Sequence, residues 1–130
     1  MKALLAVPLV LLAGCAAVQQ YATMLSGPWG GQGVKLMLEG GLGTAEFDCA
    51  SGTLDQAIPS QPVPFSVSGT YRTGQSGPVR VGQIFKSQPA TYSGLAVKGE
   101  MTLQVKLEDG TELGPYTLHE GAPGQINRCP

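Results

Sequence analysis

The chain has 130 residues, with 8 lysines and arginines against 9 aspartates and glutamates and a formal net charge of −1. This near-neutral balance excludes the basic surface that nucleic-acid binding requires, and no polybasic stretch is present that could bind anionic lipid. Removal of the signal predicted below leaves 116 residues, which is the length of one domain.

The first fourteen residues have the pattern of an export signal. Lys2 supplies a positive charge, and the apolar run 3–12 that follows is shorter than the ~20 residues that span a bilayer. A charged start, a short apolar core and small residues after it predict a secretory signal peptide at 1–14. The residues Leu12-Ala13-Gly14-Cys15 resemble the bacterial lipobox, a resemblance that implies lipidation of Cys15. The alternative is an ordinary signal peptide that contains a cysteine.

Residues 15–26 are predicted to be the lipidated cysteine and a tether. Eleven extended residues after Cys15 reach about 36 Å, and acyl chains alone hold such a protein on a membrane. Ala16 follows the cysteine, where lipoproteins retained in the inner membrane of Gram-negative cells tend to have aspartate. The resemblance therefore implies a lipid-anchored envelope protein, at the outer membrane facing the periplasm if the cell is Gram-negative.

Residues 27–130 are predicted to be a β domain. Apolar and polar residues alternate in several runs, most regularly in 101–108, and no helical period follows the signal. Glycine-bearing connections at 39–43, 98–100 and 109–110 favour hairpin turns. The pattern predicts an all-β antiparallel meander of about seven or eight strands that closes into a small barrel or sandwich. The predicted strands are 31–38, 43–49, 52–57, 64–72, 90–98, 100–108, 111–119 and 125–129.

One long connection interrupts the meander at 73–89, a stretch rich in Gly, Pro, Ser and Gln. Loops of this length in compact domains are usually functional or disordered. The segment is therefore a candidate binding loop, with Arg80, Phe85 and Lys86 as its contact residues. The alternative is a loop that only closes one end of the fold.

The cysteines fit an exported protein. With Cys15 assigned to lipid, Cys49 and Cys129 remain as one pair, and an oxidising compartment favours a disulfide between them. A bridge closing a loop of about 81 residues contributes roughly 4.5 kcal/mol in the chain-entropy model. A metal site or a reactive thiol is the alternative, for which His119 is the only available histidine.

No constellation predicts catalysis, a metal site or a cofactor. The glycine-rich stretches 27–33 and 40–43 precede no helix, so they are predicted to be turns rather than phosphate loops. The single histidine, His119, is expected to be a solvated residue at a strand end. Glu46 and Asp48 are two residues apart on a predicted strand, so both point to water.

Two family resemblances extend over the β domain. From Trp29 onward the chain resembles a group of small bacterial proteins to which no activity is assigned. The matching segments are Trp29-Gly30-Gly31, residues 46–55, Gly69-Thr70-Tyr71, Tyr92-x-Gly94, residues 101–105, residues 113–118 and Cys129. Gly27-Pro28-Trp29 is similar to the G-x-W motif that begins the first strand of lipocalin-type barrels, which implies that a basic residue, here Arg128, covers Trp29 by a cation–π contact.

The sequence therefore predicts a non-catalytic binding or interaction module of the cell envelope, whose partner is an envelope protein or a small apolar ligand. A structural or protective envelope protein is the second hypothesis. A hydrolase that uses the carboxylates of Glu46 and Asp48 is the third.

Overall fold

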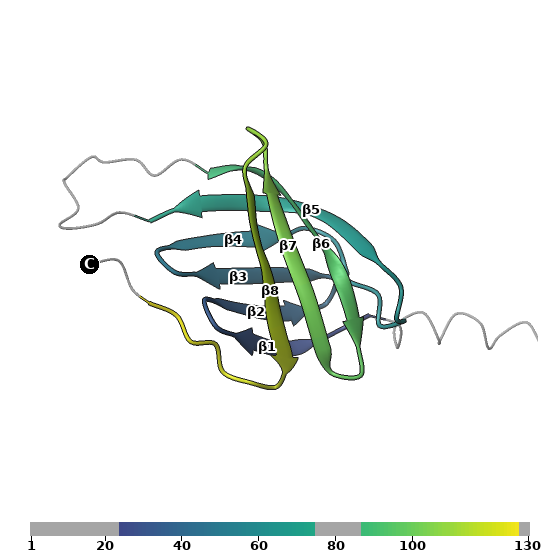
Figure 1. Cartoon of the computed structure of the whole chain (residues 1–130). Coiled ribbons are helices and arrows are strands. Elements are labelled where there is room, and N and C mark those ends of the chain that lie inside the picture. The colour runs from purple at the N-terminus through teal and green to yellow at the C-terminus, as the bar shows by residue number, and fades with distance from the viewer. Residues whose placement is uncertain (1–23, 75–86, 128–130) are drawn as a thin grey trace, which may run out of the picture.

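The protein is an eight-stranded antiparallel β-barrel. The computed structural model describes residues 24–74 and 87–127. Each strand pairs with its neighbours in the sequence, and β8 pairs with β1 to close the sheet, as Figure 1 shows. The strands are β1 (Gly27–Gly31), β2 (Val34–Glu39), β3 (Leu42–Phe47), β4 (Ala50–Leu54), β5 (Phe65–Thr73), β6 (Ser87–Val97), β7 (Glu100–Leu107) and β8 (Glu112–Glu120). The predicted all-β meander is confirmed, and its closed form is a barrel rather than a sandwich.

The up-and-down order gives the barrel two distinct ends. The near end, where β1 begins, carries the β2–β3 turn, the β4–β5 connection and the β6–β7 turn (Figure 1). The far end carries the β1–β2, β3–β4 and β7–β8 turns. At the far end β5 ends at Thr73 and β6 begins at Ser87, so residue 73 and residues 87–89 of the predicted loop 73–89 belong to strands.

The interior of the barrel is filled by the apolar members of the alternating runs. In β7, Met101, Leu103 and Val105 are fully buried, while Thr102 between them is exposed. The same alternation appears in β2 and β3, as it must where successive side chains point to opposite faces of a sheet. The largest fully buried side chains are Trp29, Tyr92, Leu36, Leu54, Ile58, Met101, Leu103, Leu118, Val34 and Val105. An eight-stranded barrel is just wide enough for side chains to fill, and here they do.

Strand glycines permit the tight curvature of so small a barrel. A Cβ added to Gly31, Gly69 or Gly94 would lie 1.9 Å from a carbonyl oxygen of the neighbouring strand. Glycine inside a strand marks places where another backbone approaches closely or the sheet bends sharply. Glycine is therefore required at these positions because a side chain would collide with the backbone of the adjacent strand.

The near-end hairpin turns have the conformation that tight antiparallel turns favour. Both turn residues have positive φ in the pairs Gly40–Gly41 (61° and 88°) and Lys98–Gly99 (52° and 81°). Positive φ at both central positions is the requirement of a type I′ turn, whose twist matches that of the flanking strands. The predicted hairpins at these places are confirmed.

Two sequence predictions about strands are wrong. The glycine-rich stretch at 27–33 is not only a turn, because residues 27–31 form β1 and pair with both β2 and β8. In the predicted final strand 125–129, the described residues 125–127 form one isolated parallel bridge, between Gln125 and Gln32, instead of a strand.

The C-terminal segment 121–127 explains both errors, because it runs along the outside of β1. A Cβ on Gly30 would lie 2.3 Å from the carbonyl oxygen of Ala122, so glycine is needed for the segment to pass. Backbone hydrogen bonds hold it: Gly121 donates to the carbonyl of Pro28 (2.7 Å), and Gln125 donates to that of Gly31 (3.0 Å). The segment therefore straps β1 from outside instead of adding a ninth strand.

Candidate functional site

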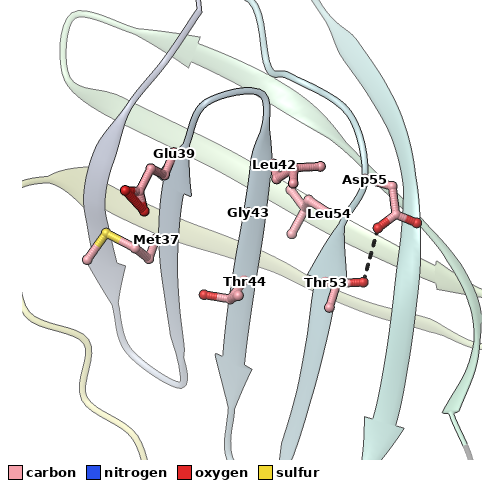
Figure 2. A pocket seen from close by; sticks show the side chains of 8 residues that line it. All are labelled: Met37, Glu39, Leu42, Gly43, Thr44, Thr53, Leu54 and Asp55. Atoms are coloured by element: carbon pink, nitrogen blue, oxygen red, sulfur yellow. Dashed lines mark hydrogen bonds between the residues drawn. The ribbon is translucent and has the colours of Figure 1, made fainter.

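A groove of about 550 Å³ lies on the outer wall of the barrel, toward the near end. It crosses β2, β3 and β4, three strands that the hairpin order places side by side (Figure 2). Its lining residues are Met37, Glu39, Leu42, Gly43, Thr44, Thr53, Leu54 and Asp55.

Apolar side chains form much of the groove although they stand on the outer face of the sheet. Met37 is 41% exposed and Leu42 is 61% exposed. In the strand ladders, Met37 lies opposite Thr44, and Leu42 lies opposite Glu39. Neither side chain belongs to the core, so both leave apolar surface in water that a contacting molecule could cover.

Polar groups border the same groove. Figure 2 shows Glu39 and Asp55 on its two sides, with Thr44 and Leu54 between them. The Thr53 hydroxyl donates to the Asp55 carboxylate at 3.3 Å and lies 2.8 Å from the hydroxyl of Thr70. Chemically, the groove offers apolar contact, hydroxyls and two carboxylates, which is a combination suited to non-covalent binding.

A second feature is an aromatic cluster toward the far end of the barrel. The Phe47 ring lies 5.5 Å from that of Tyr71, 5.6 Å from that of Tyr116 and 6.4 Å from that of Tyr92, measured between centroids. Tilted and offset pairs at such distances are favourable. The Tyr92 hydroxyl donates to the carbonyl of Thr70 on the neighbouring strand β5 at 2.6 Å. Gly52 makes room for that hydroxyl, since an added Cβ would lie 2.2 Å from it.

Burial raises the pKa of Tyr92, and Tyr71, Asp55 and Tyr116 raise it further by charge repulsion. Burial also raises the pKa values of Tyr71 and Tyr116, which are only partly enclosed. Each effect favours the neutral phenol, so these tyrosines serve as packing and hydrogen-bonding groups at neutral pH.

The tyrosine cluster predicts a loss of stability in alkali. Unfolded tyrosine ionises near pH ~10, whereas folded Tyr92 keeps its proton to higher pH. The folded state therefore binds more protons above that pH, so the stabilisation is complete below it and falls as pH rises further. In Tyr92→Phe, loss of the hydrogen bond should cost about 0.5–1.5 kcal/mol at pH 7, and the alkaline decline should be shallower. Urea unfolding at neutral and alkaline pH measures both, and parallel pH profiles for wild type and variant would contradict the assignment.

Of the three cysteines, Cys49 lies in the described residues, in the turn between β3 and β4. Its sulfur is disulfide-bonded. The predicted partner Cys129 and the predicted lipidation site Cys15 both lie outside the described residues. The backbone N–H of Cys49 donates to the carbonyl of Asn127 at 3.2 Å, so the chain leading to Cys129 passes beside Cys49. The Cys49–Cys129 pairing itself stays a prediction.

Of the other residues predicted to make contacts, one lies within the described residues and the rest lie outside them. Trp29 is buried, and its indole N–H has no hydrogen-bond partner among the described residues. Arg128, predicted to cover Trp29, lies outside those residues, as do Arg80, Phe85 and Lys86 of the predicted binding loop. Neither the barrel-closing contact nor the loop surface is tested.

The two carboxylates considered for hydrolysis occupy different positions. Glu46 is exposed on β3, whereas Asp48 is in the turn after β3 rather than on the strand. The Asp48 carboxylate accepts a hydrogen bond from the Asn127 N–H at 2.7 Å and so helps to hold the C-terminal segment. His119 is exposed near the end of β8, opposite Glu100. Within residues 24–74 and 87–127, no group of three or more His, Cys, Asp or Glu side chains could hold a metal ion.

Sequence reasoning missed the groove. Its one visible signal was that Met37 occupies an outward position in the alternation of β2, where the other members are Lys35 and Glu39. Thr53 and Asp55, which complete the groove, are far from Met37 in the sequence and come near it through the pairing of β2 with β3 and of β3 with β4. One sequence does not give those two registers.

Comparisons with known proteins found no matching family model, no matching curated protein and no matching solved structure. In the part of the chain that the structure describes, no helix is long and apolar enough to cross a membrane.

Proposed function

We propose that this protein is a lipid-anchored, non-catalytic binding module of the bacterial cell envelope, which binds an envelope protein through the outer groove of β2, β3 and β4. The anchor is the acylated Cys15, and the envelope location follows from the signal peptide and lipobox at residues 1–15. The Cys49–Cys129 bridge belongs to the same proposal, since an oxidising compartment favours it.

The observation that supports binding at the wall is the contrast between the two faces of the sheet. The interior is occupied by large buried side chains such as Trp29 and Tyr92, which favours a protein partner over a small apolar ligand held inside. The outer wall instead presents Met37 and Leu42 to solvent beside two carboxylates. Exposed apolar groups with a polar border are typical of protein-binding surfaces.

Closure of the sheet also limits how a partner can bind. All strands have hydrogen-bonded neighbours on both sides over part or all of their length, so addition of a partner strand along a free edge is not the expected mode. The expected mode is instead recognition by side chains on the outer wall, and the groove residues are such side chains.

The substitution Met37→Glu tests the proposal. It places a charge in the apolar part of the groove, so we expect it to abolish co-purification of the partner from crosslinked cells. Leu95→Glu is the matched control, because Leu95 is 37% exposed on β6, outside the groove. Both variants should keep wild-type unfolding profiles, since each position is at the surface. The proposal is wrong if Met37→Glu and wild type recover the same proteins in the same amounts.

A further inference from the structure

The exposed large hydrophobic side chains of the barrel are all in its near half. Among the described residues they are Met37, Leu42, Val63, Leu95 and Val97. Leu42 is the first residue of β3, Val97 is the last residue of β6, and Val63 belongs to the β4–β5 connection. These three therefore stand on the near-end rim itself. Such a one-sided distribution indicates that the near end faces an apolar environment.

The chain also joins the barrel at this end. The Leu25 N–H donates to the carbonyl of Ile58 at 2.8 Å, and Met24 forms a bridge with Pro59. Both partners lie in the β4–β5 connection at the near end. The backbone is therefore fixed to this rim from residue 24 onward, and Cys15 is only nine residues earlier in the sequence. An extended segment of that length reaches at most about 30 Å.

The charged residues around the near-end rim indicate which kind of lipid surface the rim can contact. Glu39, Glu100 and Glu120 lie at the near-end termini of their strands, Asp55 follows β4, and Lys98 occupies the β6–β7 turn. Carboxylates thus outnumber ammonium groups among the described rim residues. An acidic rim is repelled by anionic lipid and is compatible with a zwitterionic surface.

We propose that the near end of the barrel rests on a zwitterionic bilayer, with Leu42, Val63 and Val97 at the boundary between headgroups and acyl chains. Apolar side chains from three separate places on the rim contact the membrane together, as the apolar face of an interfacial element does. This inference rests on the proposed lipid anchor. In this orientation Leu42, at the near-end edge of the groove, contacts the membrane, and Met37 and Thr44 remain accessible to the partner. The partner is then a protein that is itself at the membrane.

Fluorescence quenching by brominated lipid tests this orientation. The full-length lipidated protein is placed in phosphatidylcholine vesicles with brominated acyl chains, as the variants Leu42→Trp, Val63→Trp and Val97→Trp. Thr111→Trp is the matched control, because Thr111 is exposed in the far-end β7–β8 turn. Trp29 is buried and gives a constant background that wild type measures. We expect loss of most of the added fluorescence in the three rim variants, little loss in Thr111→Trp, and weaker quenching when anionic phosphatidylglycerol replaces part of the lipid.

Vesicle flotation tests the lipid anchor separately from the orientation of the barrel. If the protein floats with the vesicles but the rim tryptophans are quenched no more than the added tryptophan of the Thr111→Trp control, the orientation is wrong and the anchor stands. If protein purified from native membranes does not float, the anchor and the orientation both fail. Equal quenching in neutral and anionic vesicles also contradicts the inference, since it removes the role of the rim carboxylates.

Discussion

A Gly69→Ala variant is expected to lose more than about 4 kcal/mol of unfolding free energy and, in a domain of ordinary stability, to fold poorly or not at all. Gly69 lies within β5 and pairs with Leu54 and Ala90. Its added Cβ would lie 1.9 Å from the Thr53 carbonyl oxygen and 3.1 Å from the Leu54 Cα. Both contacts are with backbone of the adjacent strand, so no side-chain rotation relieves them.

The sign of this effect is informative because glycine-to-alanine changes commonly stabilise proteins by about 0.4–1 kcal/mol where the backbone conformation suits both residues. Gly110→Ala is the control: Gly110 has a φ of 93°, and nothing lies within 4 Å of an added Cβ. That variant should lose only the strain of a left-handed alanine, about 1–2 kcal/mol. Urea unfolding of both variants makes the comparison, and a Gly69→Ala protein as stable as wild type would mean that β4 and β5 are not as close as described.

Loss of the Cys49–Cys129 bridge is expected to cost about 2–5 kcal/mol, a large part of the stability of a domain this size. The bridge would join the β3–β4 turn to Cys129, which follows the C-terminal segment 121–127 in the sequence. Two hydrogen bonds already bring these parts together, Asn127 N–H to the Asp48 carboxylate and Cys49 N–H to the Asn127 carbonyl. Without the covalent link, only hydrogen bonds and packing hold the segment 121–127 against the barrel, and the unfolded chain regains the freedom of a loop of about 81 residues.

Single and double variants identify the pairing. Cys49→Ala, Cys129→Ala and the double variant should be destabilised equally, because removal of either sulfur already breaks the bond. Thermal unfolding of each, with and without reductant, is the measurement, and reductant should lower the midpoint of wild type to that of the variants. A wild-type midpoint that reductant does not change, or costs of the single variants that add in the double, would show that Cys49 and Cys129 are not joined.

Much of the fold was predictable because strands that bury only one face have alternating apolar and polar residues in the sequence. The run at 100–107 alternates without a break, and it forms β7 with Met101, Leu103 and Val105 fully buried. Strand β1 was missed because its glycines have no side chains to alternate. It is a strand because β2 and β8 supply hydrogen-bonded backbone on both sides and the C-terminal segment covers Gly30.

The candidate site was much less predictable than the fold. A sequence pattern places Met37 on the outer face of β2, but it does not say which residues lie across the next two strands. The ladders put Thr44 beside Met37 and Thr53 beside Thr44, so the groove depends on two registers at once. Those registers follow from turn geometry and from packing of the core, neither of which one sequence states directly.

The central claim, that the groove of the outer wall is the binding surface, is tested most directly by photo-crosslinking in living cells. A photoreactive amino acid replaces Thr44, inside the groove, or Thr102, which is exposed on β7 outside it. The account predicts a discrete crosslinked species from position 44 that is absent from position 102 and is lost when Met37→Glu is added. Crosslinks from position 102 alone, or the same species from both positions, would contradict it.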